Sequence, residues 1–308
     1  MTPEEFRRHG YAMIDLIADY RQNIEQRGVQ PTTVPGEIKA ALPVNPPESA
    51  EPFEQIMGDV EKLIMPGLLH WQHPSFFGFF PSNVELSSVL GDCLSTGLGV
   101  VGLSWQSSPA LTEIEEVTTD WLRDMIGLSR EWSGVIQDSA STSTLVALIS
   151  ARERSSQYAL VHDGLQNSGA PLIVYTSAHA HSSVNKAAIL AGFGQNNIRM
   201  VATDAHNAMS PQALAYAIEQ DLAAGNRPCV VIATTGTTAA MAIDPLDAIG
   251  ELTQRHGLWL HVDSAMAGAA MILPECRALW NGIEKADSLV LNPHKWLGAA
   301  FDCSVYFV

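Results

Sequence analysis

The stretch LWLHVDSAMAG, residues 258–268, places a continuous apolar run directly before an acidic residue. Two similar short runs, LIVY (172–175) and CVVIAT (229–234), occur earlier, and helical patterns separate the three. Two of these helices are predicted to start at the pairs Ser210-Pro211 and Asp244-Pro245, each a helix cap followed by a first-turn proline. Continuous apolar strands separated by helices are typical of a parallel sheet covered on both faces. We therefore predict an α/β fold with functional groups at the carboxyl ends of the strands.

Composition excludes several classes of protein. The chain has 308 residues, a net charge of −16, 46% hydrophobic and 16% charged residues, which is typical of a globular protein. The negative charge argues against general nucleic-acid binding. No apolar stretch approaches a membrane span, and the N-terminus lacks the pattern of a secretory signal, so we expect a cytoplasmic protein. The four cysteines are scattered and predict neither disulfides nor a zinc site: Cys93, Cys229, Cys276 and Cys303.

The N-terminal part has a different organisation. Thr2 and Glu5 predict a capping box at the start of an amphipathic helix, and six prolines between Pro31 and Pro52 predict an extended segment before a second helix. Such a segment has no core of its own, so we expect it to pack on another subunit. We predict two parts, a helical segment at 1–83 that packs in a dimer and carries a substrate loop, and a large domain at 84–308.

Two motifs suggest sites that their context does not support. GLGVVG, residues 97–102, matches the dinucleotide fingerprint, but a helical pattern precedes it and LSWQSSP follows it, whereas the fingerprint needs a strand, a turn and a helix. His179 and His181 lack a third ligand at a recognisable spacing, so we predict no metal site.

Three predicted strand ends carry the residues that point to chemistry. Asp263 follows the run 258–262, and a carboxylate there needs a partner because its burial alone is costly. The segment 139–141 (Ser-Ala-Ser) opens a helix whose free amides and hydroxyls suit a phosphate, although these serines could equally serve only as a helix cap. Asn292 and Lys295 follow the apolar run 289–291. An anion cradle, a carboxylate and a lysine amine are what pyridoxal phosphate requires, for its phosphate, its pyridine nitrogen and its Schiff base.

Four motifs carry a family resemblance along essentially the entire chain: HWQHPSFFGFFPSN (70–83), AHSS (180–183), HVDSAMAG (261–268) and NPHKW (292–296). Together they resemble the group II pyridoxal-phosphate-dependent decarboxylases, most closely the aromatic-L-amino-acid (DOPA) decarboxylases of bacterial type. Lys295 lies 32 residues after Asp263, a spacing that is specific to that pattern. The resemblance implies an aspartate-aminotransferase-like large domain (PLP fold type I), with a mainly parallel sheet, and a homodimer.

The resemblance also implies individual roles. Three residues would be catalytic: Lys295 as the Schiff-base lysine, Asp263 as the pyridinium partner, and His181, which would stack on the cofactor ring and touch the substrate. Further cofactor contacts would come from the phosphate-binding residues Ala140, Ser141 and Asn292, from Thr238, and from Ala265 on the opposite ring face.

Substrate choice would depend on the aromatic segment at 70–83, which read alone could also be a plain apolar core segment. The resemblance implies substrate contacts from Trp71, Phe79, Phe80, Ser82, Leu103 and His181. Phe79 and Leu103 stand where some relatives have tyrosine and phenylalanine, and Met266 replaces a tyrosine of animal relatives. The preference among DOPA, tyrosine, tryptophan, hydroxytryptophan and phenylalanine therefore stays open.

Chains of this family continue past position 308, into a mobile loop with a proton-donating tyrosine and a small C-terminal domain. We therefore expect these residues to be part of a longer decarboxylase, and residues 1–308 alone to be inactive. Two alternatives stay open: an aromatic aldehyde synthase of the same family, and a noncatalytic truncated dimer partner.

Overall fold

The computed structural model describes residues 1–79, 83–165 and 169–308, without the side chains of Val161 and Asp163. It separates into two compact units, Met1–Ser82 and Asn83–Val308. Phe80 and Ser82, two of the predicted substrate residues, lie outside the described residues. None of the helices within the described ranges combines the length and the apolar character that a bilayer span requires.

The first unit is helical. The predicted capping box is present, because Thr2 N donates to Glu5 Oε2 (2.7 Å) and Glu5 N donates to Thr2 Oγ1 (3.2 Å). Few of its described side chains are buried, among them His9, Ile24 and Met65, so it has only a small core. Its helical segments are α1 (Pro3–Gln22), η1 (Ile24–Gln26), α2 (Glu37–Ala41), α3 (Phe53–Asp59), η2 (Val60–Ile64) and η3 (Met65–Gly67).

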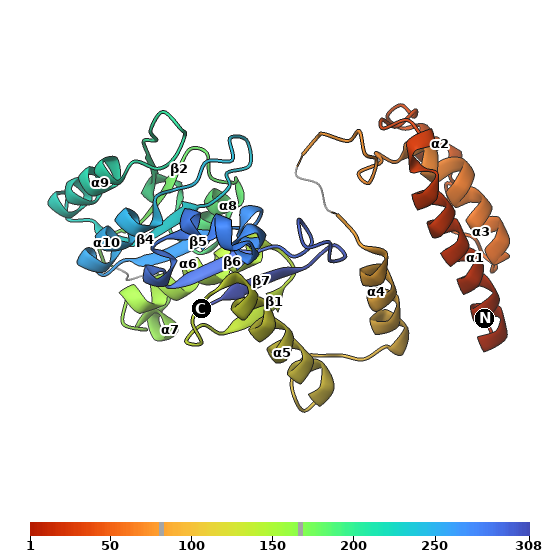
Figure 1. Ribbon diagram of the computed structural model, residues 1–308, viewed down its shortest axis with the longest axis horizontal. Helices are drawn as coiled ribbons and strands as arrows, with labels where there is room; N and C mark the ends of the chain where they lie inside the picture. Colours follow the sequence, from red (N-terminus) through yellow and green to blue (C-terminus); the bar gives the residue numbers. More distant parts are fainter. Residues whose placement is uncertain (80–82, 166–168) are drawn as a thin grey trace. The chain divides into compact units, whose positions relative to one another are not determined.

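The second unit is built on a seven-stranded sheet in the order β1-β7-β6-β5-β4-β2-β3 (Figure 1). Strand β7 is antiparallel to both neighbours, and the other neighbouring strands are parallel to each other. The strands are β1 (Gly134–Gln137), β2 (Leu172–Ser177), β3 (Ile198–Val201), β4 (Arg227–Thr234), β5 (Trp259–Asp263), β6 (Ser288–Leu291) and β7 (Ser304–Phe307).

Helices cover both faces of this sheet, as the continuous apolar strands predict. On one face, α6 and α8 pack on side chains such as Val174, Val230 and Ile232. On the other face, α5, α9, α10 and the 3₁₀ segments η5 and η6 bury Tyr175 and Val262. The helical segments of this unit are α4 (Leu86–Leu98), α5 (Pro109–Ile126), α6 (Ala140–Ser155), α7 (Leu160–Asp163), α8 (Ser183–Leu190), η4 (Gln195–Asn197), α9 (Pro211–Ala223), α10 (Leu246–His256), η5 (Ala267–Ile272), η6 (Pro274–Trp280) and η7 (Ile283–Lys285).

The strand directions fix where polar groups gather. Because β7 runs opposite to both β1 and β6, strand β1 points the same way as the parallel strands. The carboxyl ends of β1, β2, β4, β5 and β6 therefore all lie at one edge of the sheet. Every segment that the sequence singles out for chemistry in this unit, except Leu103, follows one of these ends.

Two predictions about local structure have different outcomes. GLGVVG begins inside α4 and continues into a loop, so the strand, turn and helix of a dinucleotide site are absent there. The predicted Asp244 helix cap is wrong. Helix α10 begins at Leu246, and the Asp244 carboxylate instead accepts hydrogen bonds from Met209 N (2.6 Å) and Thr234 N (2.8 Å). The carboxylate thus binds two buried backbone amides instead of capping the helix.

Candidate active site

Backbone hydrogen bonds join the ends of β4, β5 and β6 into one platform. Asp263 lies opposite Thr234 on one side and Val290 on the other. Beyond the last registered residues, Asn292 N donates to Ala265 O (3.1 Å), and Lys295 N donates to Asn292 O (3.0 Å). The segment that carries Lys295 is thus tied directly to the segment that follows Asp263.

The helix that opens with Ser139 lies on the same face of the sheet as Asp263. Side chains alternate along a strand, so His261 and Asp263 face the same way. The Nε2 atom of His261 lies 3.4 Å from Thr144 Oγ1 in the second turn of α6. Ser139 caps that helix by accepting from Thr142 N (3.3 Å). The start of α6 therefore sits over the strand that ends at Asp263.

Lys295 is partly buried beside a negative charge. Burial lowers the pKa of its amine below the usual value, and the charge of Asp263 acts in the opposite direction. A lowered pKa raises the fraction of uncharged amine, which is the nucleophilic form. The effect of the Asp263 charge on Lys295 agrees with the backbone bonds that tie their two segments together.

Asp263 is 5% exposed, and its Oδ1 atom accepts a hydrogen bond from Ala265 N (3.1 Å). Ala265 is itself partly buried, two residues after Asp263. A carboxylate so placed can hold a proton on a heteroaromatic nitrogen, because its negative charge favours the cationic form. This is the environment that the pyridine nitrogen of pyridoxal phosphate needs.

Four buried oxygen atoms at this edge have no hydrogen-bond partner within the described residues: Thr176 Oγ1, Ser177 Oγ, Thr234 Oγ1 and Asn292 Oδ1. Strand alternation and register place Thr176 and Thr234 on the face of Asp263. Buried polar atoms are normally hydrogen-bonded, so these oxygen atoms at one edge indicate that a polar group binds there and supplies their hydrogen bonds. The residues present therefore fit a polar cofactor such as pyridoxal phosphate.

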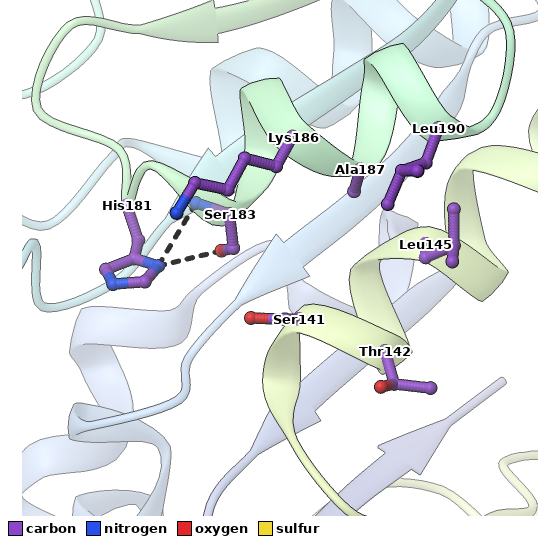
Figure 2. A pocket seen from close by; sticks show the side chains of 8 residues that line it. All are labelled: Ser141, Thr142, Leu145, His181, Ser183, Lys186, Ala187 and Leu190. Carbon is purple, nitrogen blue, oxygen red and sulfur yellow. Dashed lines mark hydrogen bonds between the residues drawn. The ribbon is translucent and has the colours of Figure 1, made fainter.

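A pocket of about 250 Å³ opens between α6 and α8. Figure 2 shows Ser141 and Thr142 on one side and His181, Ser183 and Lys186 on the other. The Nδ1 atom of His181 lies 2.8 Å from Ser183 Oγ and accepts from Ser183 N (3.3 Å). These contacts fix the ring and favour a proton on Nε2. The structure thus brings a predicted phosphate ligand and the predicted ring-stacking histidine to one pocket.

Other predicted residues are not gathered in this way. Thr238 is exposed in the turn after β4. Leu103 is 85% exposed in the loop between α4 and α5. Trp71 and Phe79 belong to the first unit, where their rings stack with centroids 5.5 Å apart. The described residues of that segment therefore form an aromatic cluster of their own.

His294 is a residue of this edge to which sequence reasoning assigned no role. Burial, and then the charge of Lys295, lower the pKa of its imidazole. Its Nδ1 atom accepts from Cys303 N (2.8 Å), and its ring lies 4.7 Å from that of Phe301. The sequence did indicate that His294 lies at the site, because His294 directly precedes Lys295.

Among the described residues, no group of three His, Cys, Asp or Glu side chains gathers as metal ligands.

Comparisons with known proteins agree with this geometry. The pyridoxal-dependent decarboxylase conserved domain matches residues 35–308. The aromatic-L-amino-acid decarboxylase of Rattus norvegicus is 43% identical over 322 residues, covering 100% of this chain and 66% of that protein. A phenylacetaldehyde synthase of Arabidopsis thaliana is 41% identical over 316 residues, covering 100% of this chain and 64% of that protein.

Solved structures share the fold. The crystal structure of Catharanthus roseus tryptophan decarboxylase in complex with L-tryptophan matches with a TM-score of 0.95 and 41% identity, covering 100% of this chain and 67% of that chain. Oryza sativa TDC with PLP and tryptamine matches with a TM-score of 0.95 and 35% identity, covering 100% of this chain and 64% of that chain. The predicted PLP fold type I is thereby confirmed. This chain spans about two thirds of the length of the curated relatives, and it belongs to the pyridoxal-dependent decarboxylase family.

Proposed function

We propose that the complete protein decarboxylates an aromatic L-amino acid to its amine and carbon dioxide, with pyridoxal phosphate as cofactor. The observation that carries this proposal is the placement of the Lys295 amine and the Asp263 carboxylate at one buried edge. When bound, pyridoxal phosphate supplies an electron sink for the bond between the α-carbon and the carboxylate. The relatives named aromatic-L-amino-acid decarboxylase and tryptophan decarboxylase support the substrate class.

The chain's own residues would divide the work of binding. Lys295 Nζ would hold the cofactor covalently, and Asp263 would keep the pyridine nitrogen protonated. The backbone amides and hydroxyl at Ala140 and Ser141, at the start of α6, would hold the phosphate, together with the Asn292 side chain. The orphaned Asn292 oxygen and the position of Ser141 in the pocket support these roles.

Three further residues would orient the cofactor and the substrate. His181 would stack on one ring face with the orientation that Ser183 imposes, and Ala265 would cover the other face. Thr238 would add a polar contact from the turn after β4. Because burial lowers the pKa of Lys295, more of its amine would be in the neutral form that can accept a proton.

Substrate selectivity would come from the aromatic segment and the loop after α4. We propose side-chain contacts from Trp71, Phe79, Phe80, Ser82 and Leu103, with His181 near the reacting carbon. The stacked rings of Trp71 and Phe79 support an apolar aromatic lining. DOPA, tyrosine, tryptophan, hydroxytryptophan and phenylalanine are the candidate substrates.

A homodimer is part of the proposal. Leu86, Leu90, Leu94 and Leu98 follow one another at intervals of four along α4, and all are exposed within the chain. Such an apolar helix face is an expected subunit contact. We propose that a second copy of the protein covers this face, with residues 1–83 also packing in the dimer. The cytoplasmic location stays a prediction from the sequence.

A second candidate reaction is aldehyde synthesis from the same substrates, in which loss of carbon dioxide is coupled to oxidative deamination and dioxygen accepts two electrons to give hydrogen peroxide. It is favoured by one finding, since a phenylacetaldehyde synthase matches at nearly the same identity as the decarboxylases. Analysis of the products from phenylalanine and DOPA separates the two reactions, because one yields the amine and the other the aldehyde and ammonia.

Borohydride reduction of the complete protein with pyridoxal phosphate tests the proposal. We expect a pyridoxyl group on Lys295 and none after Lys295→Ala. Lys186 also lines the pocket and is therefore a second lysine that the pyridoxyl group could modify. A pyridoxyl group on Lys186 in the parent protein, or on no lysine at all, would contradict the assignment.

A further inference from the structure

A buried triad of polar side chains lies on the face of the sheet opposite to Asp263. The indole Nε1 of Trp280 donates to Thr235 Oγ1 (3.0 Å) and to Ser264 Oγ (3.2 Å), and the two hydroxyls are hydrogen-bonded to each other. Exposure is 0% for Thr235 and Ser264 and 2% for Trp280. The surrounding core cluster is apolar, with Ala233, Val262 and Ala267 among its members.

The triad holds two strand ends together at the cofactor edge. Thr235 directly follows β4, and Ser264 directly follows β5. Thr235 N also donates to Asp263 O (3.0 Å), and Ser264 N donates to Val290 O (3.0 Å). The side chains of the triad thus link Thr235 to Ser264 on the far face, one residue away from the backbone bond that links Thr235 to Asp263.

Ser264 stands between two residues proposed to contact the cofactor. Because side chains alternate, Ser264 points away from the face that carries Asp263. Ala265 follows it, and Thr235 begins the turn that leads to Thr238. The backbone is closely packed here, since a Cβ added at Gly236 would lie 2.7 Å from Ala267 Cβ.

We propose that Trp280, Thr235 and Ser264 are positioning residues, which set the orientation of the Asp263 carboxylate toward the cofactor ring. The inference rests on the proposed function. Neutral hydrogen bonds suit this role because their geometry is directional while they add no charge near the reacting groups. Without the triad, the end of β5 would keep its backbone bonds but lose the side-chain contacts that resist rotation about residues 263–265.

Thr235→Val and Thr235→Ser are a matched pair for the test in the complete protein. Valine has the shape of threonine without the hydroxyl, whereas serine keeps the hydroxyl. We expect Thr235→Val to lower kcat by roughly 10- to 100-fold, since small misplacements of catalytic groups have such effects. KM should change little. The affinity for pyridoxal phosphate should fall, and the pH midpoint of the bound cofactor's absorbance should shift. Thr235→Ser should keep the parent values.

Trp280→Phe provides a second route, because it removes only the indole N–H and keeps an aromatic ring. It should repeat the shift in cofactor absorbance. Tyr175→Phe is the structural control, since it removes another buried hydrogen bond on the same face, from Tyr175 Oη to Asp221 Oδ2 (2.9 Å), two strands from Asp263. This control should lower Tm while leaving kcat and the absorbance unchanged.

The outcomes separate the two proposals. A parent protein that binds no pyridoxal phosphate would overturn the proposed function and this inference with it. A parent that binds it, with Thr235→Val and Trp280→Phe lowering only Tm as Tyr175→Phe does, would overturn the positioning role alone.

Discussion

At the residue scale, burial and the Asp263 carboxylate act in opposite senses on the pKa of Lys295. Burial favours the uncharged lysine, whereas the carboxylate favours the charged one. Burial has the larger effect, so the amine stays closer to its nucleophilic state than an exposed lysine would. The arrangement therefore suits a lysine that reacts as a nucleophile.

Asp263→Asn tests the role of the carboxylate. An amide cannot stabilise a protonated pyridine nitrogen, so kcat for an aromatic amino acid should fall by at least about 100-fold, while the affinity for pyridoxal phosphate falls much less. Steady-state kinetics and a cofactor titration on the complete protein measure the two effects. A variant that turns over at the parent rate would show that Asp263 does not act on the ring.

The burial of the His261 imidazole leads to a prediction about acid stability. Complete burial lowers its pKa to about 3, from an ordinary value of about 6.5. Below pH 6.5 the unfolded chain therefore binds a proton that the folded chain does not, and stability falls as the pH falls toward 3. At pH 5 the loss from this residue is about 2 kcal/mol.

The comparison of His261→Gln with the parent isolates that effect. Asp244, whose pKa burial raises to about 6, contributes in the opposite direction, but it is common to both proteins. The free energy of unfolding in urea at pH 7.5 and at pH 5.0 gives the pH dependence of each. We expect the loss on acidification to be smaller by about 2 kcal/mol in the variant. Equal losses would mean that His261 is protonated in the folded protein.

The sequence predicts which single residues carry the chemistry of the site better than it predicts the partners of buried side chains. Asp263, Lys295 and Ser139 could be found because each interrupts an apolar run or starts a helix. The partners of Trp280 and His261 could not, because they depend on which strands pair. The Asp244 prediction fails for the same reason, since Met209 and Thr234 become neighbours only in the folded sheet.

At the scale of elements, the sequence predicts which segments form the buried parallel strands. Continuous apolar runs predict the parallel strands β2, β4 and β5, and each is buried on both faces. The antiparallel strand β7 between β1 and β6 does not follow from any local pattern. It matters for the site, since it sets the direction of β1 and hence places the start of α6 at the cofactor edge.

The close contact between the start of η7 and the start of α10 leads to a prediction at this scale. Gly282 has φ +96°, and a Cβ there would lie 2.4 Å from the backbone N of Asp247 at the start of α10. Gly282→Ala should therefore cost at least about 3 kcal/mol, from backbone strain and overpacking together. Gly257→Ala is the control, because Gly257 also has positive φ (+66°) but no atom within 4 Å of its Cβ position.

The control should lose only about 1–2 kcal/mol, the strain of a left-handed residue. Urea unfolding of both variants measures the difference between them. Equal losses would mean that α10 can shift away from η7, and that the close approach at Gly282 is not needed for the fold.

At the scale of the whole molecule, the sequence predicts more of the second unit than of the first. The second unit buries continuous apolar strands, so local patterns and burial agree. The first unit has few buried side chains, so the apolar pattern of its helices does not predict which contacts they make. The exposed leucines of α4 present the same situation inside the second unit.

Those leucines provide the test of the proposed homodimer. Leu90 is 57% exposed at the middle of the α4 face, and Tyr216 is 64% exposed on α9, outside that face. In a symmetric dimer, Leu90→Asp removes an apolar contact from both copies at about 1.5 kcal/mol or more each, which raises the dissociation constant by at least roughly 100-fold. Light scattering after size-exclusion chromatography of the complete protein should show a dimer for the parent and for Tyr216→Asp, and a monomer at low concentration for Leu90→Asp. A parent of monomer mass, or a Leu90→Asp variant that stays dimeric on dilution, would mean that this face does not bind a second copy.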